Sequence, residues 1–283
     1  MGRGARYTVS IGSGPFSLSA LLAAGILTML AGGAAHAATV LAPPAIGKPG
    51  VITYCSAINL PPMEFLSPAT KPEGLDVDIG DEIAKRLGVK AAWNNVPFSG
   101  LIPAILAGQC DAIISDLFIK PERLKVLDMV PYLYSHEVVL LKAGSPKVPG
   151  LADLSGKKVA TVTGTTATIL LQQENAALKT AGKPLIDIVM FPENTQALQQ
   201  LEFGQVDAYG VAYEPADYYM RQDPGKFALN GPPYFKILTG IAVDKKNPAL
   251  NSDISETIAA MMKDGTYGKL LAKWNLQTDA VGK

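Results

Sequence analysis

The sequence predicts an α/β fold with largely parallel sheets. Apolar runs with strand character alternate with segments of helical periodicity, which is the pattern of strand–helix–strand units. One run, residues 112–115, is almost wholly apolar, as expected of a strand buried on both faces of a parallel sheet. The strand-like runs cover residues 51–55, 91–96, 111–115, 138–142, 158–163, 186–191, 208–211 and 239–243.

Two helices are predicted between the first strands. In residues 76–88 the apolar positions Ile79, Ile83 and Leu87 recur at helical spacing, and Gly88 provides a stop. Residues 98–106 repeat the apolar pattern before Gly108. Both segments are therefore expected to cover a sheet with one apolar face. The last helical region spans residues 251–274.

The N-terminal residues have the pattern of a secretory signal peptide. Arg3 and Arg6 precede an apolar run over residues 16–31, and a small-residue cleavage site ends at Ala37. The run is shorter than the roughly 20 residues of a spanning helix. The first cysteine, Cys55, lies far from the cleavage point, so an acyl anchor is not expected. Cleavage leaves about 245 residues, enough for one large or two small cores.

Composition argues against several classes of partner. Lys and Arg together number 25, as do Asp and Glu, so no basic face points to nucleic acid. His136 is the one histidine after the cleavage point, and neither cysteine has metal-ligand spacing to it. Phosphate-loop, dinucleotide-glycine and nucleophile-elbow patterns are missing from the sequence. We therefore expect no cofactor and no metal.

Five segments carry a resemblance to a known family: GLDVDIGDEIAKRLG (74–88), VPFSGLIPAILAGQ (96–109), DAIISDLFIKPER (111–123), GKKVATVTGTT (156–166) and KDGTYGKLLAKWNL (263–276). Together they closely resemble the solute-binding proteins that feed polar amino acids to bacterial ABC importers, the bacterial extracellular solute-binding protein family 3. The resemblance implies a two-lobe periplasmic binding protein fold of type II. Lobe 1 is expected to comprise residues 38–135 and 245–283, and lobe 2 residues 136–244, with hinge crossings near residues 135–138 and near Asp244.

The resemblance also implies a function. The protein is expected to be the periplasmic substrate-binding component of an ABC importer, a monomer that captures an amino acid or related small carboxylate between its lobes and passes it to an inner-membrane permease. Two alternatives stay open. One is a cyclohexadienyl-dehydratase-like enzyme with Glu64, Asp116 and Glu214 as its candidate acids and bases. The other is a ligand-sensing protein for a chemoreceptor.

In this fold the strands at 51–55 and 111–115 are parallel neighbours. Cys55 then lies at the carboxyl end of one strand and Cys110 at the amino end of the other, an offset of more than about 10 Å. A disulfide requires Cα atoms within about 7 Å. Although an exported chain invites a disulfide, we expect two free thiols.

Arg123 is the leading candidate ligand-binding residue. In the family resembled, the arginine of this motif holds the ligand's carboxylate, which its guanidinium matches with two parallel hydrogen bonds. Thr165 and Thr166 open a helix after the strand at 158–163 and are expected to hold the same carboxylate from lobe 2. Phe98 matches a position that packs on the ligand side chain. Each residue has an alternative role. Arg123 is then a surface residue, Thr165 part of an ordinary helix N-cap, and Phe98 a core residue.

Several positions depart from the family pattern. An aromatic residue is replaced by Leu60, a hydroxyl residue by Phe118, and the serine pair reads Ser115-Asp116. The family's two acidic positions are Ala57 and Ala212, and the second aspartate is the one that grips the ligand's amino group. Asn59 and Glu64 stand nearby as further candidate ligand contacts.

These departures leave the amino-group anchor open. A buried ammonium costs about 1 to 3 kcal/mol or more for each missing bond. Either the ligand has no α-amino group, or Asp116 and Glu214 supply replacement charges. Asp116 could instead pair with Arg123 in the empty site.

Overall fold

The computed structural model describes residues 45–147 and 150–282, all within one unit of the chain. The predicted signal peptide, residues 1–37, lies outside the described residues. Among the residues described, no helix is both long enough and apolar enough to cross a membrane.

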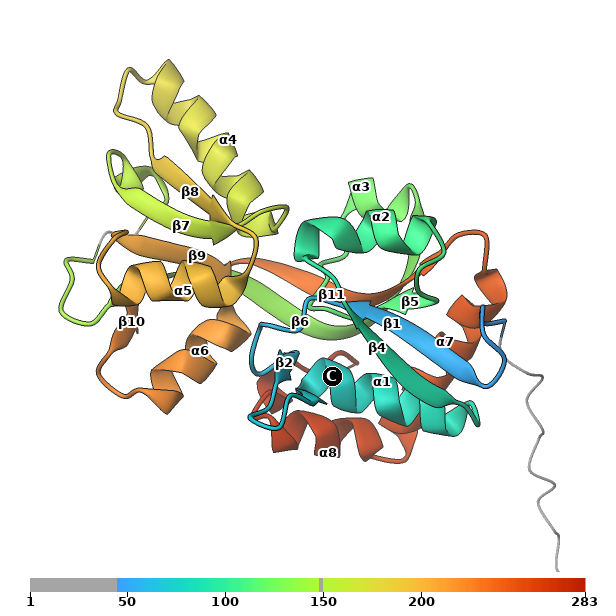
Figure 1. The fold of residues 1–283 in the computed structure, drawn as a ribbon. Coiled ribbons are helices and arrows are strands. Elements are labelled where there is room, and N and C mark those ends of the chain that lie inside the picture. Colours follow the sequence, from blue (N-terminus) through green and yellow to red (C-terminus); the bar gives the residue numbers. More distant parts are fainter. Residues whose placement is uncertain (1–44, 148–149, 283) are drawn as a thin grey trace, which may run out of the picture. The chain divides into compact units, whose positions relative to one another are not determined.

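The strands of the described residues form one mixed sheet and one small hairpin, which confirms the α/β class (Figure 1). The order in the large sheet is β4-β1-β5-β11-β6-β9-β7-β8, and β10 pairs with β6. Strand β1 is parallel to β4 and β5, and β7 is parallel to β8 and β9, whereas β11 and β6 run antiparallel to their neighbours. The strands are β1 (Val51–Ser56), β4 (Lys90–Asn95), β5 (Ala112–Ile113), β6 (Leu127–Lys142), β7 (Lys158–Val162), β8 (Asp187–Phe191), β9 (Ala208–Ala212), β10 (Phe227–Leu229) and β11 (Tyr234–Asp244), with the hairpin β2 (Phe65–Leu66) and β3 (Pro72–Glu73).

Helices cover the sheet on both faces. They are α1 (Leu75–Arg86), α2 (Leu101–Leu106), α3 (Pro121–Leu124), α4 (Thr166–Thr180), α5 (Asn194–Glu202), α6 (Tyr213–Gln222), α7 (Pro248–Lys263) and α8 (Thr266–Lys273). Helix α1 buries Ile79 and Ile83 as predicted, and Gly88 follows its end with a φ of +71°. The predicted helix at 251–274 is divided in two because Gly265 takes the left-handed conformation, φ +80°.

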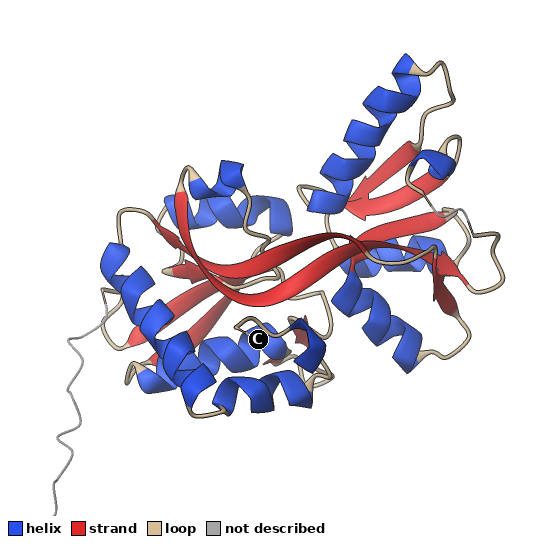
Figure 2. Ribbon diagram, turned by 180° about the vertical axis from the view of Figure 1, so that it is seen from behind, coloured by secondary structure: helices blue, strands red, loops and turns tan. Residues whose placement is uncertain are grey.

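Two long strands, β6 and β11, run side by side through both halves of the described unit (Figure 2). We call β1, β4, β5, α1, α2, α3, α7 and α8 the first half, and β7–β10 with α4–α6 the second half. Strand β6 passes from the first to the second near Glu137, which pairs with Ala212 of β9. The return crossing lies in β11 before Ala242, which already pairs with Ile113. The position near Asp244 expected from sequence is the carboxyl end of the same strand.

Each half has apolar clusters on both faces of its strands. In the first half, Ile52 packs with residues of α1, α7 and α8, and Ile113 packs with residues of α2 on the other face. Figure 1 shows α1 and α8 on one side of these strands and α2 and α3 on the other. In the second half the clusters form around Tyr209 and around Val159. Burial on both faces explains the nearly continuous apolar strands in the sequence.

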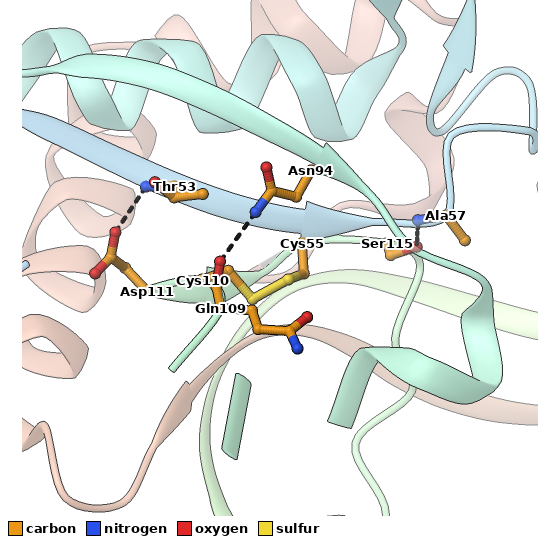
Figure 3. Close-up of a disulfide and its surroundings, with 8 residues drawn as sticks. All are labelled: Thr53, Cys55, Ala57, Asn94, Gln109, Cys110, Asp111 and Ser115. Atoms are coloured by element: carbon orange, nitrogen blue, oxygen red, sulfur yellow. Dashed lines mark hydrogen bonds between the residues drawn. A yellow bond between two sulfur atoms is a disulfide. The ribbon is translucent and has the colours of Figure 1, made fainter. Parts of the chain in front are cut away.

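The prediction of two free thiols is wrong. Cys55 and Cys110 form a disulfide with a Cα–Cα distance of 5.7 Å (Figure 3). The prediction assumed that Cys110 continues the line of the neighbouring strand back toward its amino end. It placed the two cysteines three residues apart along the sheet.

The chain does not follow that line, because it bends at Asp111. Strand β5 begins only at Ala112, opposite Tyr54. The Asp111 amide donates to the Thr53 carbonyl at 2.8 Å, and its carboxylate accepts from the Thr53 amide at 2.7 Å. The residues before Asp111 therefore lie across β1, as the Asn94 side chain bonded to the Gln109 carbonyl shows (Figure 3). This places Cys110 over Cys55.

Candidate functional site

A cavity lies among residues from both halves and from the crossing strand β6. Most of its lining is apolar, and its charged side chains are Asp116, Arg123 and Glu137. The first half contributes Leu60, Phe98, Asp116, Phe118 and Arg123; β6 and the second half contribute Glu137, Val162, Thr165, Thr166, Ala167, Asn194, Gly210, Val211 and Ala212. The mixture of apolar walls and a few charged groups is typical of a small-molecule site.

Arg123 is buried in the lining of this cavity. It belongs to the short helix α3 and is 6% exposed. Its Nη1 donates to the Phe118 carbonyl at 2.8 Å, and its guanidinium lies 5.6 Å from the centre of the Phe98 ring. Burial lowers its pKa to about 10. Within the described part of the chain it forms no ion pair with a carboxylate. The alternative in which Asp116 pairs with Arg123 in the empty site is therefore not observed.

Thr165 and Thr166 face the same cavity at the start of α4, but their hydroxyls differ. The Thr165 Oγ1 donates to the Val162 carbonyl at 2.8 Å and accepts from the Thr168 amide at 3.4 Å, so Thr165 is an N-cap. Thr166 is 4% exposed, and its Oγ1 has no hydrogen-bond partner. Its hydroxyl therefore remains available to a ligand.

Asp116 reaches the cavity through a strained backbone. Its φ is +42°, a left-handed conformation that is uncommon for a non-glycine residue. Its amide donates to an Asp76 oxygen at 2.8 Å, and its Oδ1 accepts from the Thr239 hydroxyl at 3.2 Å. Burial raises the pKa of its carboxyl well above the usual range, and neighbouring carboxylates raise it further.

Four predicted residues lie outside the lining. Ser115 donates to Glu64 at 2.7 Å and accepts from the Ala57 amide, so this pair joins loops within the first half. Glu214 turns instead to Ser135 of β6, whose hydroxyl donates to it at 2.7 Å. Asn59 accepts two hydrogen bonds from Asn194 and so connects the halves beside the cavity. Each of these side chains is therefore hydrogen-bonded to protein groups in this structure.

The structure also places Glu137 and Asn194 in the lining. The sequence had indicated Glu137 as an acidic residue near a cleft or hinge turn with a solvated or capping role, and Asn194 was not a candidate. Glu137 is 2% exposed, accepts a hydrogen bond from the Ala167 amide, and has one oxygen, Oε2, without a partner. Burial raises its pKa to about 8. The signal in the sequence was a charged residue that opens an otherwise apolar strand at the predicted crossing.

Carboxylates outnumber cations in the buried surroundings of the cavity. The buried cations are Arg123 and Lys120, and Lys120 pairs with Glu122 at 3.0 Å. Asp76 accepts from the Tyr132 hydroxyl at 2.6 Å, and burial raises its pKa to about 6. The buried carboxylates of the described residues are Glu64, Asp76, Asp116, Glu137, Glu214 and Asp279.

Comparison with known proteins gives a consistent family. The model of the bacterial extracellular solute-binding proteins, family 3, matches residues 52–277. The lysine/arginine/ornithine-binding periplasmic protein of Escherichia coli (strain K12) is 32% identical over 210 residues, covering 71% of this chain and 78% of that protein. The ABC transporter arginine-binding protein 1 of the same organism is 28% identical over 228 residues, covering 79% and 90%.

A solved structure is similar throughout the described unit. It is the ancestral amino acid-binding protein AncCDT-1, a precursor of cyclohexadienyl dehydratase, with a TM-score of 0.72 and 28% identity. The match covers 80% of this chain and 95% of that one.

Proposed function

Since the chain belongs to the bacterial extracellular solute-binding proteins, family 3, we propose that it captures an amino acid or related small carboxylate in the periplasm and delivers it to an inner-membrane ABC permease. Its fold is the type II periplasmic binding protein fold. In this proposal the lobes, residues 38–135 with 245–283 and residues 136–244, hinge on the two crossing strands and close over the cavity. The mature protein works as a monomer, freed from its signal peptide.

One observation carries the proposal. Arg123 is buried and forms no ion pair within residues 45–147 and 150–282, and the unpartnered Thr166 hydroxyl lines the same cavity. Burying a guanidinium is costly unless an anion pairs with it, as its lowered pKa reflects. A ligand carboxylate satisfies both groups, because its oxygens accept from the planar fork and from the hydroxyl at once.

The experiment is a binding screen on two arginine variants. The parent is screened by thermal shift with the common L-amino acids and small carboxylates, because a ligand that binds only the folded state raises its melting temperature. Arg123→Ala should bind each hit about 100-fold more weakly, from the loss of buried charged hydrogen bonds. Arg221→Ala is the matched control, since Arg221 pairs with Asp217 on the surface of α6. An Arg123→Ala protein that binds as tightly as the parent refutes the proposal.

We propose binding rather than catalysis. Of the three candidate acids and bases for a dehydratase, Glu64 and Glu214 lie outside the cavity lining, and Asp116 alone lines it. Incubation with prephenate or arogenate should therefore yield no aromatic product. Formation of such product at a rate that depends on Asp116 would make the protein an enzyme.

A further inference from the structure

The cavity carries a second charged surface opposite in sign to Arg123. Asp116 and Glu137 both line it, from the first half and from the crossing strand β6. Each is almost fully buried, and the charge of Glu137 contributes to raising the pKa of Asp116. The ligand proposed above uses Arg123 and Thr166, so these two carboxylates remain to be explained.

Glu137 has a free hydrogen-bond acceptor beside the cavity. Its Oε2 has no partner, although its other contact, the Ala167 amide, fixes the side chain beside the cavity. In the described residues neither of the two nearest cations forms an ion pair with Glu137, since Lys120 pairs with Glu122 and Arg123 forms no ion pair. Both cations lower the pKa of Glu137, but burial outweighs them and the pKa is raised. A buried carboxylate in this state is costly.

Asp116 presents a second acceptor to the same space. One oxygen, Oδ1, is occupied by the Thr239 hydroxyl. The backbone holds this residue in a left-handed conformation, and the amide bond to Asp76 supports it. Strain of this kind persists where the surroundings fix a side chain in a functional position.

The end of β9 presents no carboxylate to the cavity. Ala212 lines the cavity with a methyl group, and Glu214 turns to Ser135. We therefore infer that Glu137, assisted by Asp116, binds a cationic group of the ligand. Glu137 is then the residue that determines specificity for that group. The inference rests on the proposed function and sharpens it. The ligand carries a carboxylate for Arg123 and an ammonium or guanidinium for Glu137, so an amine-free acid is not the preferred ligand.

The test compares matched ligands on matched variants. The probes are the L-amino acids that bind in the screen, and for each one the same acid without its α-amino group, measured by titration calorimetry. Glu137→Gln keeps an oxygen to accept from the Ala167 amide but cannot be ionised. Glu64→Gln is the control, because Glu64 is also buried with one unpartnered oxygen and lies outside the lining.

We expect Glu137→Gln to weaken binding of cationic probes at least about tenfold, as a charged hydrogen bond is lost, and to leave amine-free, uncharged-side-chain acids unchanged or tighter. Glu64→Gln should match the parent. If the cation is the α-ammonium, removing it from the probe abolishes the effect; if it is the side chain, the effect survives. Should Glu137→Gln fail to fold, Glu137→Asp, which keeps the charge, must retain the preference for cationic probes.

Equal affinity of Glu137→Gln and the parent for every cationic probe overturns the inference. A parent that prefers amine-free acids also overturns the inference. If binding of those acids depends on Arg123, the proposed function is still supported. A parent that binds none of the probes refutes both.

Discussion

Removal of the Cys55–Cys110 disulfide should destabilise the protein by about 4 kcal/mol. The bond closes a loop with a sequence separation of 55. For a loop of that length the chain-entropy relation gives about −14 cal/mol/K in the unfolded state, or about 4 kcal/mol at 25 °C. Both cysteines are buried among Leu101, Ile105 and Ile113, so the double variant Cys55→Ala/Cys110→Ala also loses a small packing contribution.

The assay is urea denaturation of the parent, the reduced parent and the double variant, followed by far-UV circular dichroism. The reduced parent should unfold at a lower urea concentration than the parent, and the double variant at a slightly lower one again because it also loses the packing of the two sulfur atoms. Reductant should have no further effect on the double variant. Ligand binding should persist in all three at low urea, because neither cysteine lines the cavity. A loss of less than about 1 kcal/mol, or a parent whose mass rises by no hydrogen atoms on reduction, would refute the reasoning.

Two further outcomes are expected. Burial raises the pKa of Glu214 from 4.5 to about 8. The folded state therefore binds this proton more tightly than the unfolded state, and the free energy of unfolding falls as pH rises from about 4.5 to 8. Glu214→Gln should remove roughly 3 kcal/mol of that decline between pH 5 and pH 8, measured by urea denaturation, and an unchanged dependence of the unfolding free energy on pH would contradict the prediction. Thr166→Val should weaken the binding of amino acids about fivefold. It should leave the melting temperature equal or higher, because the hydroxyl has no partner in the empty protein. Reduced stability with unchanged affinity would show that the hydroxyl serves the fold.

The sequence identified the fold because its periodicity is strong. Helix α1 and the apolar strands follow directly from the spacing of Ile79 and Ile83 and from runs such as residues 112–115. The class depends on such averaged patterns, which individual substitutions do not disturb. The α/β class was confirmed for this reason.

The site was harder to predict because side-chain direction depends on local backbone. Ser115 and Asp116 are adjacent, yet Ser115 turns into the first half and Asp116 into the cavity, where its φ is positive. The bend at Asp111 likewise brought Cys110 to Cys55 against the expected register. Glu137 was expected to have a solvated or capping role because a lone acidic residue in a strand gives no sign of which groups surround it.

The paired crossing strands also make the second half a cassette. Ser135 of β6 lies opposite Ile237 of β11, so the segment between them starts and ends at neighbouring positions of the two crossing strands. Neighbouring strands are only about 5 Å apart, and insertions whose ends lie close together are well tolerated. The segment could thus be exchanged for its counterpart from a relative at two adjacent junctions. Such chimeras would transplant Thr166 and Glu137 together while Arg123 stays behind, which separates the recognition of the carboxylate from that of the rest of the ligand.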